Sequence, residues 1–253
     1  MKILRQTIRK LLIEGLYFRR LKNMALVQVE NSGTTGYSYL LFYPEMTEYL
    51  LKYQNEMSMK ELALNPHMIA MMKVSEHNPQ WEGDGCLGAW EVKLVSALSG
   101  WGPTMYDIVM GDSPNGLTAD RGSVSEDAYD VWDFYHKKRE DIDMKPLDWN
   151  RRQWTPDTKD DCDWGADSEA WQMHNSWDDD EYDYIWDDPS IKKGDFLSDP
   201  LNWVYNRGPV PNRDILRQNG ERAEQHMLTF SYWDEDEWAK LARAFFDVND
   251  VDD

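Results

Sequence analysis

Cysteine is almost absent from this sequence. Only Cys86 and Cys162 occur, and neither lies in a Cys-x-x-Cys pair. Two isolated cysteines do not form the framework of a disulfide-rich secreted domain, and they lack the ligand spacing of a zinc site. The five histidines form neither a His-x-His nor a His-Glu-x-x-His pair. We therefore expect no metal centre, a reducing intracellular setting, and free thiols at both cysteines.

Long apolar runs and basic residues are also scarce. No stretch approaches the roughly 20 apolar residues that a membrane-spanning helix needs, and no secretory signal segment is recognisable. Lys and Arg number 27 against 47 Asp and Glu, which gives a net charge of -20. Binding bare nucleic acid requires clustered Lys and Arg to neutralise phosphates. The sequence therefore predicts neither a membrane span nor a nucleic-acid interface.

Tryptophan, in contrast, is abundant. The 253 residues include 13 tryptophans, and 41% of the chain is hydrophobic, which is typical of a globular protein with a sizeable core. Many of these tryptophans lie beside acidic residues, as Trp164, Trp177 and Trp186 do. Such rings can anchor an interface or close a core, and we favour the core. The length fits one large domain, alone or with an appendage.

Turn residues divide the first part of the chain into elements. Residues 24–30 and 37–43 are rich in β-branched and aromatic side chains and are predicted strands joined by a glycine-containing turn. Residues 45–72 are predicted to be helical with a break near Pro66, and residues 76–85 to form a loop. Residues 86–98 are the most strand-like segment, because apolar and charged residues alternate from Trp90 onward.

The turn Gly100-Trp101-Gly102-Pro103 follows this strand and leads into a predicted helix at residues 103–110. A short strand at 117–120 and a helix at 125–138, capped by Ser125, are predicted next. A strand that opens through glycines into a helix directs free N–H groups and the positive end of the helix dipole to one place, which suits a pyrophosphate. A plain strand-to-helix connection explains the same turn equally well.

Residues 90–139 resemble the second half of the GNAT N-acyltransferases, specifically a divergent branch found among tailed-phage proteins. WEVKLVSALSGWGPTMYDIVMG resembles the fourth strand, the pyrophosphate loop and the following helix of that family. GLTADRGSVS is similar to the fifth strand and its exit, and SEDAYDVWDFYHKKR to the next helix. The resemblance implies an α/β (α+β) fold at residues 24–148, with a GNAT-like, mixed, mostly antiparallel sheet flanked by helices.

The resemblance also implies that the protein binds acetyl-CoA and transfers its acetyl group to an unidentified amine or protein acceptor. The main chain of the strand would pair with the pantetheine arm, and the N–H groups of the turn would hold the pyrophosphate. The thioester would lie where the strand ending near Leu98 diverges from the strand beginning at Leu117. The implied cofactor-binding residues are Leu94, Val95, Ser96, Gly100, Trp101, Gly102, Pro103, Thr104 and Met105.

Two positions depart from the family pattern. Ala97 stands where Gln or Arg usually opens the loop, and Trp132 stands where a tyrosine often serves as the general acid. A phenol can protonate a leaving thiolate, whereas an indole N–H cannot. Tyr129 and Tyr135 flank Trp132 at helical spacing and are the candidate catalytic residues. The alternative function is a non-catalytic virion or internal head protein that keeps the fold.

The opening residues, 1–23, form a predicted basic amphipathic helix with Leu4, Ile8, Leu11 and Leu12 on one face. Leu12-Ile13-Glu14 before Gly15 resembles the cleavage site of phage prohead proteases, and the preceding peptide resembles capsid-targeting peptides. This resemblance implies removal of residues 1–14, phage capsid proteins as partners, and a location in the host cytoplasm or a phage head. A transit peptide or an ordinary helix packed on the domain is the alternative.

Residues 149–253 are predicted to be an acidic, Trp-rich extension packed on the domain. Within it, residues 196–205 are predicted to be partly extended, and residues 213–227 and 236–246 helical. The acidic stretch 157–188 lacks the ligand order of an EF-hand, so we interpret it as a solvated face. Asp120-Arg121, inside the central segment, is interpreted as a strand-end ion pair.

Overall fold

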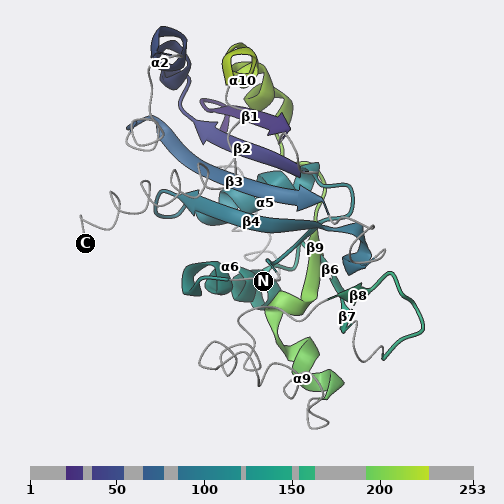
Figure 1. Ribbon diagram of the computed structural model, residues 1–253. Coiled ribbons are helices and arrows are strands. Elements are labelled where there is room, and N and C mark those ends of the chain that lie inside the picture. Colours follow the sequence, from purple (N-terminus) through teal and green to yellow (C-terminus); the bar gives the residue numbers. More distant parts are fainter. Residues whose placement is uncertain are drawn as a thin grey trace, which may run out of the picture.

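The computed structural model describes residues 21–30, 36–53, 65–76, 85–120, 124–149, 154–162 and 192–227. Seven strands form one mostly antiparallel sheet in the order β1-β2-β3-β4-β5-β9-β6 (Figure 1). Within this order only β4 and β5 run parallel. The strands are β1 (Ala25–Glu30), β2 (Gly36–Phe42), β3 (Met68–Glu76), β4 (Trp90–Ala97), β5 (Leu117–Thr118), β6 (Asp143–Pro146) and β9 (Trp203–Asn206).

The first three strands are buried on both faces. On one face Leu41 lies beside Leu26, and Tyr39 beside Met72, within the main hydrophobic core. On the other face Leu40 lies between Val27 and Met71, and both of these residues are fully buried. Strands covered on both sides consist of nearly continuous apolar residues rather than an alternating pattern. The run Met68–Val74 of β3 is of this kind.

Helices flank the sheet. Helix α5 (Gly102–Asp112) lies behind β3 and β4 in Figure 1, and α6 (Glu126–Lys138) lies below β4. Helix α10 (Arg213–Met227) packs against β1 and against α2 (Glu45–Tyr53). Gly220 makes this close packing possible, because a Cβ atom there would collide with the main chain of Leu26. A sheet flanked by helices is the predicted fold class, and this part of the prediction is confirmed.

Several predicted elements agree with the structure. Residues 213–227 are helical as predicted, and α6 begins after Ser125, whose Oγ accepts a hydrogen bond from the Ala128 N–H. Helix α2 confirms the first part of the helix predicted at 45–72, whereas residues 54–64 lie outside the described residues. The prediction is wrong at its end, because β3 occupies Met68–Glu76. Sequence periodicity cannot distinguish a buried strand from a buried helix in so short an apolar run, and pairing with both β2 and β4 selects the strand.

The prediction of free thiols is also wrong. Cys86 and Cys162 form a disulfide, with their Cα atoms 4.7 Å apart. Cys86 lies in the short helix η1 (Cys86–Gly88) just before β4, and Cys162 lies in β8 (Asp161–Cys162), which pairs with β7 (Asp148–Trp149). The two cysteines are 76 positions apart, and it is the fold that brings them together.

Residues beyond 148 contribute a strand to the main sheet and helices beside it. Strand β9 lies between β5 and β6, and it follows α9 (Lys193–Ser198) and η3 (Pro200–Asn202). No helix among the described residues is both long and apolar enough to cross a membrane. The predicted helix at 236–246 lies outside the described residues. So does most of the predicted helix at 1–23, including the Leu12-Ile13-Glu14 pattern, because the described residues begin at Leu21.

Candidate functional site

Strands β4 and β5 separate soon after they meet. Their parallel pairing is limited to Trp90 opposite Leu117 and Glu91 opposite Thr118, whereas β4 continues to Ala97 along β3. A register shift accompanies the separation: Val74 lies opposite Val92 and Lys73 opposite Leu94, so Lys93 is an extra residue in β4. A bulge of this kind bends a strand and increases its twist. The β5-facing edge of β4 beyond Glu91 therefore has no β-ladder among the described strands.

The glycine turn follows directly at the end of β4. Gly100 has a φ of +79°, and the Trp101 N–H donates to the Leu98 carbonyl oxygen at 2.9 Å. Helix α5 then begins at Gly102, with Pro103 in its first turn and no side-chain cap from Trp101. A Cβ atom at Gly100 or Gly102 would meet nothing within 4 Å. The turn is thus open on the side of these glycines.

Few backbone donors of the turn are used by the helix. The Met105 N–H donates to the Trp101 carbonyl oxygen at 3.1 Å, and Pro103 has no N–H. Helix geometry leaves the amides of Gly102 and Thr104 without partners inside α5. These donors and the positive end of the helix dipole favour a bound anion.

The predicted cofactor-binding residues follow one another along β4, the turn and α5. Leu94 and Val95 are half-buried in β4, whereas Ser96 is buried. Gly100 is exposed, and Trp101, Gly102 and Pro103 are half-buried. Thr104 and Met105 are buried, and the Met105 side chain belongs to the hydrophobic core. Because the side chains of Thr104 and Met105 are buried, only the main chain of these two residues could contribute to a ligand site.

Tyr135, one of the two candidate catalytic residues, is fully buried on α6. Its hydroxyl lies 2.8 Å from the Pro103 carbonyl oxygen and 2.8 Å from Asp107 Oδ1. Both partners are acceptors and the phenol has one proton, so in this arrangement the proton is directed at α5. The hydroxyl links α6 to the first turn of α5, next to the glycine turn.

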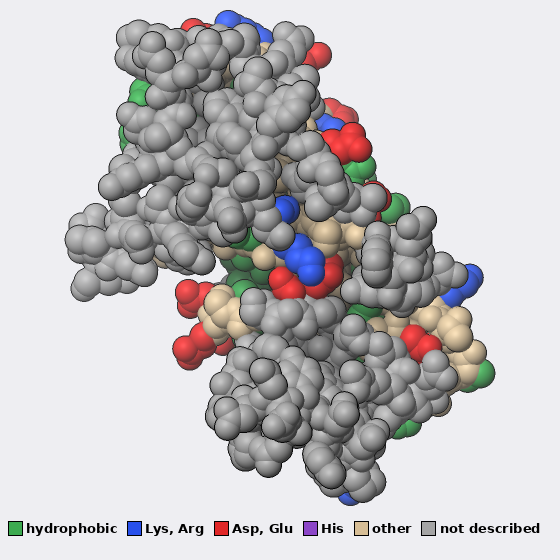
Figure 2. Space-filling view, in the orientation of Figure 1, with side chains coloured by type: hydrophobic (Ala, Val, Ile, Leu, Met, Phe, Trp, Pro, Cys, Tyr) green, Lys and Arg blue, Asp and Glu red, His purple; other side chains and the backbone are tan. Residues whose placement is uncertain are grey.

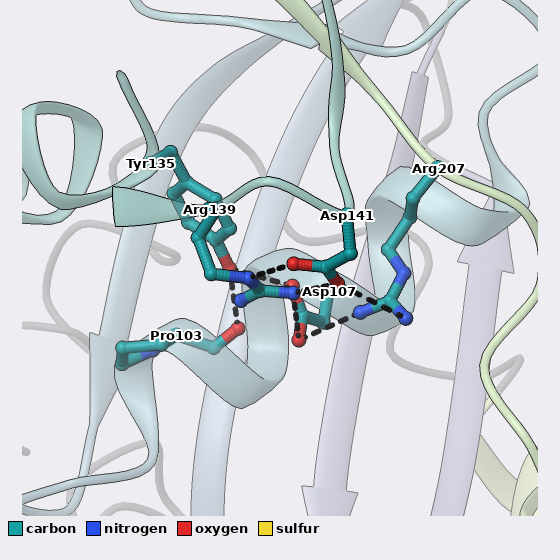
Figure 3. A network of polar contacts seen from close by, with 6 residues as sticks. All are labelled: Pro103, Asp107, Tyr135, Arg139, Asp141 and Arg207. Atoms are coloured by element: carbon teal, nitrogen blue, oxygen red, sulfur yellow. Dashed lines mark hydrogen bonds and ion pairs between the residues drawn. The ribbon is translucent and has the colours of Figure 1, made fainter. Parts of the chain in front are cut away.

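Asp107 is the centre of a buried ionic network that includes Tyr135 (Figure 3). Arg207 Nη1 lies 2.7 Å from Asp107 Oδ2, and Arg139 Nη1 lies 3.2 Å from Asp107 Oδ1. Arg139 Nε also lies 2.8 Å from Asp141 Oδ1. Two guanidinium groups thus face two carboxylates. The network fixes α5 to the end of α6 and to the segments beside β6 and β9.

Electrostatics supports this description. The hydrogen bond from Arg139 holds the pKa of Asp141 at about 2, although burial opposes ionisation. For Arg139, burial favours the neutral form, but the hydrogen bond to Asp141 and the charge of Asp107 outweigh burial and raise its pKa above the usual value. The Arg139 guanidinium also lies 5.0 Å from the centre of the Tyr135 ring, a cation–π distance. Arg139 and Asp141 therefore both stay charged near neutral pH.

The residues around Trp132 form an aromatic core. Trp132 is 1% exposed, and its ring lies 4.9 Å from that of Tyr106 and 5.0 Å from that of Tyr205. Tyr129, the other candidate catalytic residue, is half-buried on α6 and packs against the same core. Of the two candidate tyrosines, Tyr129 is the more accessible.

A charged group that was not predicted from the sequence lies where β4 and β5 separate, and in it Asp120 pairs with Lys93. Lys93 Nζ lies 2.7 Å from Glu91 Oε1 and 3.6 Å from Asp120 Oδ1. Glu91 is 5% exposed and Lys73, on β3, is 7% exposed. Charged residues in a strand that is covered on both faces are the signal that could have identified this group. In the space-filling view, basic and acidic side chains gather near the centre of the face that is toward the viewer (Figure 2).

A second acidic group lies beside the disulfide. One ligand oxygen from each of Asp148, Asp160 and Asp161 falls within 4.8 Å of the others, and oxygen ligands of this kind suit Mg²⁺ or Ca²⁺. Thr155 already donates from its N–H to Asp148 Oδ2 and from its hydroxyl to Asp160. Because these internal hydrogen bonds account for much of the arrangement, we assign no ion to it.

Comparison with known proteins identifies no relative: no protein-family model, curated protein or solved structure matches the chain significantly. The GNAT and phage resemblances therefore stay predictions. The features of the molecule that bear on function are the geometry of β4, the glycine turn, α5 and β5.

Proposed function

We propose that this protein is an acyl-CoA-dependent N-acyltransferase of the GNAT type, encoded by a phage, that transfers an acetyl group to an amine. The observation that carries the proposal is the course of β4: its pairing with β5 ends at Glu91, and the strand continues to Ala97 before an open glycine turn and a helix without a side-chain cap. A strand that continues past the end of its β-ladder suits the amides of a pantetheine arm, and the helix amides suit a pyrophosphate. One extended ligand would satisfy both features.

The reaction requires the acceptor amine, after giving its ammonium proton to water, to attack the thioester carbonyl carbon. A C–N bond forms and the C–S bond breaks; the nitrogen gives up a second proton, and the departing CoA thiolate takes up one. Tyr129 is the better placed candidate donor for that proton, because it is only half-buried. Tyr135 would first have to leave Pro103 and Asp107.

Calorimetric titration with acetyl-CoA tests the proposal. We expect saturable binding with one molecule per chain, and an increase in thermal stability that grows with ligand concentration. Desulfo-CoA has the pyrophosphate and both amides of the arm but no thiol sulfur, and it should bind as well. No heat and no thermal protection with either ligand would rule out the proposed cofactor.

Gly102→Leu locates the binding site. Gly102 lies in an ordinary backbone conformation with open space around it, so the variant should fold while its side chain blocks the helix amides. We expect acetyl-CoA affinity to fall by at least about tenfold, equivalent to about 1.4 kcal/mol. Gly194→Leu is the matched control, because Gly194 also has open space around it but lies in α9. Equal affinities for the two variants would refute the placement of the pyrophosphate.

The alternative is a virion or internal head protein that keeps this fold without catalysis. Two observations favour it: Trp132 is a core residue, and the Tyr135 hydroxyl is held by α5. Release of free CoA in the presence of acetyl-CoA and a panel of amines separates the two functions. If acetyl-CoA binds but every amine leaves CoA release at the buffer rate, the result favours the non-catalytic alternative.

A further inference from the structure

The Cys86–Cys162 disulfide lies in a small hydrophobic core that is distinct from the main core of the sheet. The buried members of this second core are Cys86, Ala89, Leu147, Cys162, Phe196 and Val204. Neither cysteine belongs to the main core, which contains residues of β1, β2, β3 and α5. The bond therefore joins β8 to the chain just before β4 and lies outside the packing that holds most of the sheet together.

The chain at Cys86 has a strained backbone. Cys86 and Leu87 have φ values of +54° and +57°, and Gly88 follows with +67°. The left-handed conformation costs free energy for a residue that carries a Cβ atom, and two such residues are consecutive here. The Leu87 N–H donates to the Lys159 carbonyl oxygen at 2.6 Å, and the disulfide holds Cys86 itself. Two restraints on this turn thus come from residues 154–162, which we call the β8 segment.

Clustered negative charge opposes the closed position of the β8 segment. One oxygen from each of Asp148, Asp160 and Asp161 lies within 4.8 Å of the others, and like charges at this distance repel. Asp148 belongs to β7, whereas the other two belong to the β8 segment, so the repulsion acts between the paired strands. Their ladder has only two residue pairs, Asp148 with Asp161 and Trp149 with Cys162. The covalent bond therefore holds together parts that strain and charge would separate.

We propose that the Cys86–Cys162 disulfide is a redox switch that keeps the β8 segment against the start of β4 and releases it on reduction. This inference goes beyond the proposed function and does not depend on it. A small dithiol is the reductant. One of its thiolates attacks a sulfur of the protein, the S–S bond breaks, and the released cysteine takes up a proton. The second thiol then displaces the other cysteine, which also takes up a proton, and the reagent leaves as a cyclic disulfide.

The released state should be open only locally. With the bond broken, Cys86 and Leu87 can leave the left-handed conformation, and the carboxylates can move apart. The sheet order places β6, which precedes β7 directly, at the opposite edge from β1, and Figure 1 shows β7 and β8 below the first strands. Strand β3 is paired along its length with β2 and β4 and has no part in the second core. It should keep its structure.

The test is amide hydrogen exchange followed by NMR, before and after treatment with dithiothreitol. The Leu87 and Asp148 amides are the reporters, because they donate to the carbonyl oxygens of Lys159 and Asp160, both at 2.6 Å. Reduction should speed their exchange by about 100-fold, and the amides of β3 should change by less than about twofold. Alkylation with iodoacetamide and mass spectrometry count the thiols released.

Variants separate the bond from the reagent and the charge from the bond. Cys86→Ala with Cys162→Ala should exchange like the reduced chain and give no response to dithiothreitol. In the reduced chain, Asp160→Asn should slow exchange of the Leu87 amide several-fold, because one charge of the cluster is gone. Asp157→Asn is the matched control, since Asp157 is exposed in the same segment and lies outside the cluster.

Faster exchange confined to the two reporter amides and the β8 segment supports the inference. Loss of protection in β3 as well would overturn it, because the bond would then support the whole fold. Unchanged exchange of the reporter amides in the Cys86→Ala, Cys162→Ala chain would also overturn it, as would failure of dithiothreitol to release thiols from the folded protein. Equal exchange in the reduced Asp160 and Asp157 variants would overturn the part assigned to the carboxylates.

Discussion

The two ends of helix α5 are built in opposite ways. At the first end, Gly100 and Gly102 face open space and no side chain from Trp101 caps the helix. At the last end, Asp112 has 1% of its side chain exposed and is held by Arg213 and Arg217 of α10. The first end leaves backbone donors available, and the last end has its polar groups paired.

The difference shows how a helix that is held firmly at one end can leave the backbone donors of its other end available to a ligand. A carboxylate at the C-terminus of a helix is repelled by the negative end of the dipole, so Asp112 requires the two guanidinium groups. Ser113 adds a hydrogen bond from its Oγ to the Gly116 carbonyl oxygen at 2.6 Å. Asp112 is paired at the last end of α5, and Asp107 in its middle is paired with Arg139 and Arg207. These contacts hold the helix in place, so its first turn needs no capping side chain.

The largest effect is expected from Asp112→Asn. The change removes the carboxylate that Arg213 and Arg217 share, and it should lower the free energy of unfolding by about 3 kcal/mol. Urea denaturation followed by circular dichroism measures the loss. The matched control is Glu48→Gln, which breaks the exposed pair between α2 and Arg222 and should cost less than about 0.5 kcal/mol. Similar losses in the two variants would contradict a special role for the ion pairs of Asp112 at the last end of α5.

Two glycine substitutions compare the turn before α5 with the turn after it. Gly116 and Gly100 both have positive φ values, +94° and +79°. A Cβ at Gly116 would lie 2.5 Å from the Tyr205 carbonyl oxygen, whereas a Cβ at Gly100 would meet nothing within 4 Å. Gly116→Ala should therefore cost about 2–3 kcal/mol, and Gly100→Ala about 1 kcal/mol from backbone conformation alone. Thermal unfolding of both variants checks the order, and a reversed order would be inconsistent with these packing distances.

The network in the middle of the helix makes a prediction about pH. The folded pKa of Asp141 is about 2, below the value of about 4 expected in the unfolded chain. A depressed carboxyl pKa contributes stability above the unfolded pKa, and that stability is lost as the pH falls from about 4 to about 2. Asp141→Asn should remove about 2 kcal/mol at pH 7, and less as the pH falls through this window. Urea denaturation of both chains across the window measures the difference, and a difference independent of pH would contradict the assignment.

Local sequence signals predicted those elements that depend on local interactions. Ser125 followed by acidic residues predicted the start of α6, and the pattern at 213–227 predicted α10, because caps and helical periodicity act over a few residues. The apolar run of β3 was assigned to a helix, since only its neighbours β2 and β4 make it a strand. The placement of β9 between β5 and β6 depends on contacts distant in sequence in the same way.

The candidate site shows the same division. The glycine turn could be located from the sequence, because Gly100, Gly102 and Pro103 have strong conformational preferences. The ion pairs of Asp107 with Arg139 and Arg207 could not, since their partners lie far apart along the chain and on different elements. The bulge at Lys93 was also hidden, because a register shift is defined only by the partner strand. Sequence therefore indicated where a ligand could bind, but not the charges around it.

The smallest effect is expected from Tyr135→Phe, which tests whether the open end of α5 depends on the middle of the helix. The variant keeps the buried ring and removes the hydroxyl contacts with Pro103 and Asp107. The loss should be about 1 kcal/mol, which is a decrease of roughly 2–4 °C in Tm for a chain of this size. If the hydroxyl only positions the first turn of α5, acetyl-CoA affinity should fall slightly, and CoA release at saturating acetyl-CoA should keep its pH profile. A loss of CoA release with unchanged affinity would instead identify Tyr135 as the proton donor, and α6 would then have to move away from Pro103 during the reaction.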